Sequence, residues 1–270
     1  MSVRIIIDST CDLPEELMQR TIVVPLSVHF GDETYLDGVT ISRRTFYEKL
    51  IESDVMPTTS QATPMAFMEV YEKVVSQGDE AVVLTIASQL SGTYQSAVLA
   101  ARDYPGKIHV VDSHSVALGS AILAEYALNL ADQGMNGADI ANELNSRWKD
   151  VRLIALLDTL EYLKKGGRIS KAVAFAGGLL SIKPVVCVED GEIKVLGKAR
   201  GSKQGNNLLF TEIKKAGGVD YSMPLVLGYT GLNDQLLKKY MEDSGSLWKD
   251  KRESLPYTCV GSVVGTHAGP

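Results

Sequence analysis

The feature that most constrains the fold is an alternation, in the first half of the chain, of short apolar runs rich in Val and Ile with helical patterns. Four such runs are expected to form strands, at residues 4–7, 22–28, 81–87 and 107–111. Continuous apolar runs of this length are typical of parallel strands that are buried on both faces. The alternation therefore predicts an α/β fold with a mainly parallel sheet and helices covering both of its faces.

Helical patterns separate these runs. Thr63 is expected to be an N-cap with Pro64 at the first helical position, and Gly78 is expected to end that helix. A second helix is expected around residues 46–51. The segment 116–130 is apolar nearly all round, which predicts a buried helix, whereas residues 140–148 carry a single apolar stripe and predict a surface helix.

The pattern changes near residue 150. Residues 183–188 and 192–198 alternate around Glu189-Asp190-Gly191, which predicts an antiparallel hairpin. Strands are also expected at residues 225–229 and 257–264, on either side of a charged helix that begins near Asn233. We therefore expect two domains. The N-terminal α/β domain comprises residues 1–150, and the C-terminal α+β domain with the hairpin comprises residues 151–270.

Composition excludes several classes of protein. The 270 residues carry a net charge of -6 with scattered Lys and Arg, so nucleic acid is not an expected partner. The three cysteines, Cys11, Cys187 and Cys259, lack C-x-x-C spacing, which favours a reducing, cytoplasmic location without a zinc site. The apolar run at the N-terminus is too short for a signal peptide, and no run is long enough to span a membrane.

Polar loops follow two of the expected strands directly, at residues 8–10 and 88–96, and residues 57–61 could reach the same edge of the sheet. Ligands of such sheets bind beyond the carboxyl ends of the strands. Ser91, Gly92 and Thr93 would place free amides at a helix N-terminus, which favours an anion. Because no Lys or Arg is nearby, a carboxylate is favoured over phosphate. Ser91 or Thr93 is also expected to cap the helix.

Other functions stay open from the residues alone. Ser91 could be the nucleophile of a small-molecule hydrolase or transferase, although Gln89 replaces the first glycine of the G-x-S-x-G motif. Gly166-Gly167-Arg168 could bind phosphate, or one of the two glycines could end a helix in the left-handed conformation. A sugar- or nucleotide-binding module is a third possibility, although both the G-x-G-x-x-G and the P-loop motifs are absent.

Seven segments, in order along nearly the whole chain, resemble the DegV family of bacterial fatty-acid-binding proteins. These segments are IIIDSTCDLP, VVPLSVHFGDETYLDG, PTTSQATP, LTIASQLSGTYQSA, GGRIS, KPVVCVEDGEIKVLGKAR and VVGTHAGP. The resemblance implies one long-chain fatty acid buried between two domains, with no cofactor and no catalysis. It further implies that the protein presents the fatty acid carboxylate to a separate fatty acid kinase, which makes acyl phosphate for phospholipid synthesis. Contact with membranes would be transient at most.

The resemblance also implies roles for individual residues. Hydroxyls of Thr59 or Ser60 and of Ser91 would hold the carboxylate, together with Gly92 and Thr93 at the helix N-terminus. Three further side chains would lie near the carboxylate or face the kinase: Arg168, Arg200 and His267. Apolar candidates for the tunnel around the acyl tail are Phe67, Ile122, Leu123, Tyr126, Phe175, Leu179 and Leu180.

Overall fold

A four-stranded parallel sheet forms the centre of the first half. The computed structural model describes residues 2–169, 182–248 and 254–270. The sheet has the order β2-β1-β6-β7 and consists of β1 (Val3–Asp8), β2 (Ile22–Val24), β6 (Glu80–Thr85) and β7 (Ile108–Asp112). All three of its strand pairings are parallel. The parallel sheet predicted from the apolar runs is confirmed.

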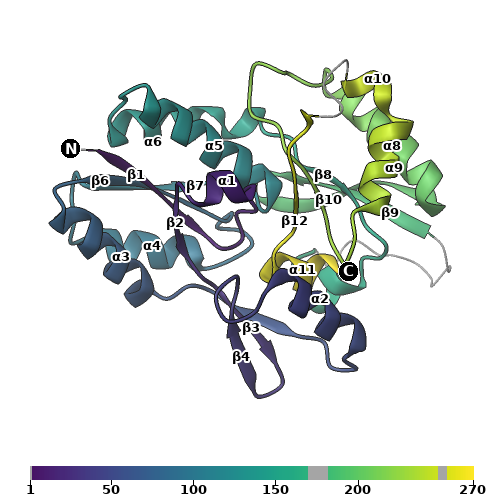
Figure 1. Ribbon diagram of the computed structural model, residues 1–270, viewed down its shortest axis with the longest axis horizontal. Helices are drawn as coiled ribbons and strands as arrows, with labels where there is room; N and C mark the ends of the chain where they lie inside the picture. The colour runs from purple at the N-terminus through teal and green to yellow at the C-terminus, as the bar shows by residue number, and fades with distance from the viewer. Residues whose placement is uncertain (1, 170–181, 249–253) are drawn as a thin grey trace.

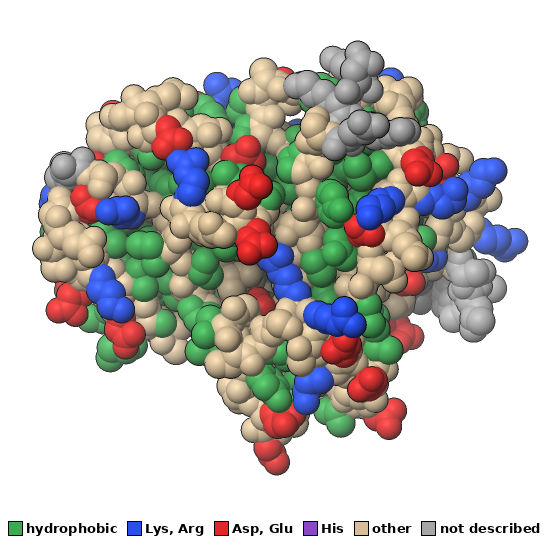
Figure 2. Space-filling view, viewed as in Figure 1, with side chains coloured by type: hydrophobic (Ala, Val, Ile, Leu, Met, Phe, Trp, Pro, Cys, Tyr) green, Lys and Arg blue, Asp and Glu red, His purple; other side chains and the backbone are tan. Residues whose placement is uncertain are grey.

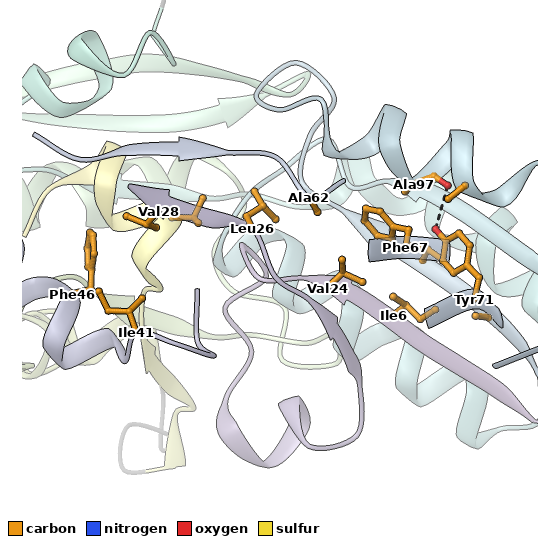
Figure 3. Close-up of a cluster of buried hydrophobic side chains, with 14 of the residues drawn as sticks. Ile6, Val24, Leu26, Val28, Ile41, Phe46, Ala62, Phe67, Tyr71 and Ala97 are labelled. Atoms are coloured by element: carbon orange, nitrogen blue, oxygen red, sulfur yellow. Dashed lines mark hydrogen bonds between the residues drawn. The ribbon is translucent and has the colours of Figure 1, made fainter. Parts of the chain in front are cut away.

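Two pairs of helices cover this sheet (Figure 1). They are α3 (Pro64–Ser76) and α4 (Thr93–Ala101) on one face, and α5 (Leu118–Asp132) and α6 (Gly137–Arg147) on the other. Helix α3 begins as the sequence predicts, because the Thr63 side chain accepts a hydrogen bond from the amide of Ala66 at 3.2 Å. Figure 3 shows Phe67 and Tyr71 of α3 packed beside Ile6 of the sheet, with the Tyr71 hydroxyl donating to the Ala97 carbonyl at 3.3 Å.

The apolar run at residues 22–28 is not one strand. Strand β2 ends at Val24, and β3 (Ser27–Phe30) belongs to a separate antiparallel sheet of order β4-β3-β5, with β4 (Glu33–Leu36) and β5 (Thr58–Ser60). Pro25 between the two strands has no amide hydrogen for a sheet ladder. The next amide, that of Leu26, donates to the Ser9 hydroxyl at 3.0 Å instead of to a strand. This break brings Thr59 of β5 close to the end of the parallel sheet.

The predicted hairpin in the second half is confirmed. Strands β9 (Ile182–Glu189) and β10 (Glu192–Arg200) pair antiparallel, and β8 (Ile154–Leu156) adds to β9. Asp190 and Gly191 both have positive φ angles, 53° and 79°, as a type I′ turn requires. Helix α8 (Gly201–Lys215) packs on this sheet. Helix α7 (Glu161–Lys165) lies between β8 and β9 in the chain.

The strand expected at residues 257–264 is wrong in its second part. Strand β12 (Tyr257–Cys259) pairs with β11 (Leu227–Tyr229) and ends there, and helix α11 (Ser262–Ala268) follows. The charged segment between them forms α9 (Gln235–Asp243) and α10 (Gly245–Trp248). Helix α11 packs against α2 (Arg43–Glu52), so the last residues of the chain return to the first half (Figure 1). Two short elements complete the fold, α1 (Glu15–Met18) and the 3-10 turn η1 (Trp148–Asp150).

Asp8 ties together the ends of two central strands. Its carboxylate is fully buried and accepts hydrogen bonds from the Thr10 amide at 2.9 Å, the Thr10 hydroxyl at 2.6 Å and the Ile86 amide at 2.7 Å. Burial raises the pKa of this carboxyl, and the three hydrogen bonds act in the opposite direction. The loops after β1 and β6 are therefore fixed to each other at the edge of the sheet.

We predict that Asp8→Ala lowers the free energy of unfolding by roughly 2–4 kcal/mol, because a buried donor without a partner costs about 1–3 kcal/mol. Urea unfolding measures this change, with the exposed Asp103→Ala as a control that stays within about 0.5 kcal/mol of the wild type. Equal stability of the Asp8 and Asp103 variants would show that Asp8 does not tie the strands together.

Candidate ligand-binding site

A cavity of about 1400 Å³ lies between the parallel sheet of the first half and the antiparallel sheet of the second. Its volume exceeds the roughly 300–1,000 Å³ of common small-molecule pockets. Apolar side chains from both halves make up much of the wall, including those of Ile122, Leu123, Leu153, Leu156, Val186, Ile193, Leu209, Ile213 and Val263. Such a wall suits a long hydrocarbon chain.

Polar residues from four separate segments meet on the wall of this cavity. They are Thr59 of β5, Ser91 and Gly92 before α4, Arg168 after α7 and His267 of α11. Thr59 Oγ1 lies 3.0 Å from His267 Nε2, although the two residues are 208 positions apart. The structure thus brings together five of the residues that the resemblance implied for the carboxylate end.

Thr59 and Ser60 differ in direction, because successive side chains of a strand point to opposite faces. Thr59 is half-buried and contacts His267. Ser60 is exposed, and its hydroxyl lies 2.7 Å from His29 Nε2 on β3, although the residue also borders the cavity. Of the two hydroxyls, that of Thr59 is therefore the one directed to the polar group around His267.

The Ser91 hydroxyl interacts with Thr93. Ser91 Oγ accepts from the Thr93 amide at 3.2 Å and lies 2.9 Å from Thr93 Oγ1. The N-cap of α4 is Gly92 and no side chain caps the helix, so the expected capping by Ser91 or Thr93 is wrong. The bond from the Thr93 amide to Ser91 Oγ instead closes a turn just before the helix. Within the part of the chain that the structure describes, the Ser91 hydroxyl interacts with Thr93 and forms no hydrogen bond with a histidine ring. The geometry of a nucleophile activated by histidine is therefore not present at Ser91.

Gln61 and Gly92 bring β5 close to the start of α4. Gln61 Nε2 donates to Ser96 Oγ at 2.9 Å, and a side chain at position 92 would overlap Gln61 Oε1. A larger residue at position 92 would therefore have to displace the end of the Gln61 side chain. The contact fixes Thr59 relative to Ser91.

Arg168 follows a helix end that the glycines form. Gly167 has φ +70°, its amide donates to Lys164 O at 3.2 Å, and the Arg168 amide donates to Leu163 O at 3.0 Å. These bonds define a Schellman motif and confirm the C-cap interpretation over the phosphate loop. The guanidinium donates to the carbonyls of Gly166 at 2.6 Å and Leu90 at 3.3 Å, so it joins α7 to the loop that carries Ser91. The expectation that no Lys or Arg lies near Ser91 is therefore wrong, because it considered only neighbours in the sequence.

His267 is neutral at pH 7. Burial, with Arg168 nearby, lowers its pKa to about 4. Its Nδ1 is buried against Gly166, where a side chain would overlap the ring, and has no hydrogen-bond partner within the described residues. The polar group therefore offers neutral donors and a single positive charge, from Arg168, which together match one carboxylate.

The residues predicted to line the tunnel fall into three groups. Ile122, Leu123 and Tyr126 of α5 line the cavity. Phe67 was expected in the tunnel and does not line the cavity, because the apolar stripe of α3 faces the parallel sheet and buries the ring completely there (Figure 3). Three candidates, Phe175, Leu179 and Leu180, lie outside the described residues.

Two polar candidates are displaced from the cavity wall. Thr93 is fully buried behind Ser91, and Arg200 is exposed at the start of α8, where its amide donates to Gln204 Oε1 at 2.9 Å. The sequence interpretation missed the wall that β8, β10 and α8 contribute. Leu209 and Ile213 are spaced by one helical turn, which was a usable signal, but spacing alone does not tell which partner a stripe faces.

The described residues show no feature of a nucleic-acid, metal or membrane-spanning site. Figure 2 shows acidic and basic side chains interspersed over one face rather than separated by sign. Within the described ranges, no group of three or more His, Cys, Asp or Glu side chains could hold a metal ion. None of the helices described is long and apolar enough to cross a membrane.

Comparison with known proteins agrees with this geometry. A family model described as "Uncharacterised protein, DegV family" matches residues 2–270. A DegV domain-containing protein of Caldanaerobacter subterraneus subsp. tengcongensis is 35% identical over 274 residues, covering 99% of this chain and 95% of the relative.

Two solved structures show the same fold. A DegV family protein from Thermus thermophilus, described as fatty acid binding, has 30% identity and a TM-score of 0.85, covering 100% of this chain and 96% of its own. A stearic acid-binding protein from Eubacterium ventriosum has 29% identity and a TM-score of 0.86, covering 100% and 95%. From the match along the whole chain and the shared two-domain fold, this protein belongs to the DegV family.

Proposed function

We propose that this protein is a non-enzymatic carrier of one long-chain fatty acid. The observation that carries the proposal is an apolar cavity whose wall includes Thr59, Ser91, Arg168 and His267, with Thr59 Oγ1 at 3.0 Å from His267 Nε2. The carboxylate would bind this group, and the acyl tail would extend along α5 and the sheet of the second half. The fatty acids bound by the Thermus thermophilus and Eubacterium ventriosum relatives support this assignment.

The energetics favour the tail as the source of affinity. Burying the ~14 methylenes of a C16 chain at about 0.8 kcal/mol each contributes on the order of 11 kcal/mol before the costs of binding. Removing a carboxylate from water costs several kcal/mol unless charge-assisted hydrogen bonds replace its hydration. The hydroxyls, the neutral imidazole and Arg168 would offset that cost without adding a second positive charge.

A carboxylate site built mainly from neutral groups suits a protein that hands its ligand on. We propose that a separate fatty acid kinase converts the bound carboxylate to acyl phosphate for phospholipid synthesis in the cytoplasm. The exposed Arg200 would then face the kinase. In this proposal the ligand lies between a domain of residues 1–150 and a domain of residues 151–270, with α11 of the second domain completing the carboxylate site on the first.

Solvent extraction of freshly purified protein, followed by lipid mass spectrometry, tests the proposal. We expect about one fatty acid per chain. The loaded protein should yield acyl phosphate from ATP only when a fatty acid kinase is added. A protein purified without lipid that also takes up no added fatty acid would contradict the carrier, as would rapid labelling of Ser91 by a fluorophosphonate.

We predict that Thr59→Val and Ser91→Ala each weaken fatty acid binding about tenfold or more, because a hydrogen bond to a charged group contributes roughly 1.5–3 kcal/mol. Ser60→Ala is the matched control, since its hydroxyl faces His29, and it should change the dissociation constant less than about threefold. Displacement of a fluorescent fatty acid measures all three variants. A larger loss in Ser60→Ala than in Thr59→Val would place the carboxylate elsewhere.

We predict that the stability difference between the wild type and His267→Gln depends on pH. Between pH 6.5 and 4 the unfolded chain binds more protons at this histidine than the folded chain does, so the contribution of the neutral ring falls as pH falls. Urea unfolding should show the difference shrinking by roughly 1–2 kcal/mol from pH 7.5 to pH 5. A difference that stays constant over this range would mean that the ring titrates as it does in the unfolded chain.

A further inference from the structure

Helix α11 carries His267 into the carboxylate site, yet little within the helix itself fixes its position. The helix has seven residues, fewer than an isolated helix needs to be stable in water. Its N-cap is Gly261, which has no side chain to accept hydrogen bonds from the free amides of the first turn. These amides must find acceptors elsewhere in the fold.

Two buried carboxylates from the first half supply the acceptors. Asp37, after β4, accepts from the amides of Ser262 at 3.0 Å and Val263 at 3.4 Å. Asp12, after β1, accepts from the amide of Gly261 at 2.7 Å. These contacts span 225 residues or more of sequence. In their ionised form these side chains also match the positive end of the helix dipole.

Helix α2 contacts both β12, the strand before α11, and one face of α11 itself. Arg43 donates to the Thr258 hydroxyl at 3.0 Å and to the Asp12 carboxylate at 3.3 Å, and the Tyr47 hydroxyl donates to the Val260 carbonyl at 3.0 Å. A side chain at Gly265 would lie 2.7 Å from the rings of α2, so the two helices approach as closely as glycine allows. The segment from β12 to α11 is therefore fixed along its length.

We propose that Asp37, assisted by Asp12, is a positioning residue for the carboxylate site. By capping α11 from the first half, it holds His267 within hydrogen-bond distance of Thr59, so that the imidazole and the hydroxyl share one fixed geometry. This proposal rests on the proposed function, because the value of that geometry is the carboxylate it would bind. Asp37 itself does not touch the ligand.

Asp37 is the sharper of the two positions to test. Asp12 has one carboxylate oxygen that is buried without a partner among the described residues, and burial beside Asp37 and Asp8 raises its pKa to about 7 despite Arg43. Asp12 is therefore partly protonated at neutral pH. Its removal would change the contact with Arg43 as well as the cap of α11. Asp37 uses both oxygens on backbone amides.

The test is Asp37→Asn, which keeps the shape of the side chain but turns an amide donor toward a backbone amide. We expect fatty acid affinity to fall about fivefold or more. The ring signals of His267 in nitrogen-15 NMR spectra of the ligand-free protein should also shift. In a His267→Ala background the same substitution should change affinity less than twofold, because a residue that acts only through His267 has no further effect once the ring is gone.

The matched control is Asp79→Asn. Asp79 is also buried and accepts from the Ser2 amide at 2.8 Å and Arg4 at 2.9 Å, but neither partner belongs to the cavity wall. This variant should lose stability without changing affinity or the His267 signals. Should Asp37→Asn fail to fold, Arg43→Met loosens the same segment at β12 and should shift the His267 signals in the same way.

Unchanged His267 signals and affinity in Asp37→Asn would overturn the proposal, as would an equal loss of affinity with and without His267. A wild-type protein that binds no fatty acid would overturn the proposed function instead. In that case the His267 signals of the ligand-free variants still decide whether Asp37 positions the ring.

Discussion

The hydrogen bonds between the last residues of the chain and the loops of the first sixty residues hold the candidate site together. Gly261, Ser262 and Val263 donate to carboxylates that follow β1 and β4, and His267 meets Thr59 on β5. Without this connection the polar group would be divided between two halves that share a largely apolar cavity. The candidate site thus depends on contacts between distant parts of the chain rather than on one loop.

The chemistry of the polar group follows from how it is assembled. Close packing leaves no room for a side chain at Gly166, which lies against the His267 ring, or at Gly265, which lies against α2. Burial of the His267 ring lowers its pKa enough to keep it uncharged at neutral pH. The Arg168 guanidinium already donates to two carbonyls, so only part of its hydrogen-bonding capacity is free for a ligand. A carboxylate in this setting would be held by directed hydrogen bonds, while hydrocarbon contact would supply the affinity.

Sequence patterns predicted the parallel sheet, helix α3 with its Thr63 cap and the hairpin at Asp190-Gly191, because each depends on local residue types. They failed where distant contacts decide. The helix after Cys259 depends on Asp37, an acceptor far away in the sequence. The break at Pro25 was missed although a proline inside an apolar run is a local signal against one continuous strand. Phe67 was assigned to the tunnel because a helical stripe shows that a face is buried but not what covers it.

Residue patterns placed the segments of Thr59 and Ser91 at the same edge of the sheet, whereas Arg168 and His267 came only from the resemblance to a family; the structure places all four on the cavity wall. The resemblance could not separate Thr59 from Ser60, because that distinction depends on which way each side chain leaves β5. The structure makes the distinction through their partners, His267 and His29. Side-chain direction is thus the main information that the structure adds to the sequence.

A crystal structure of the protein loaded with a long-chain fatty acid is the most direct test of this account. We predict carboxylate oxygens within hydrogen-bond distance of Thr59 Oγ1 and Ser91 Oγ, with His267 behind Thr59 and the acyl chain against Ile122 and Leu123 of α5. A carboxylate that lies in solvent or at the Ser60 and His29 pair, with the space between the halves filled by water, would contradict it.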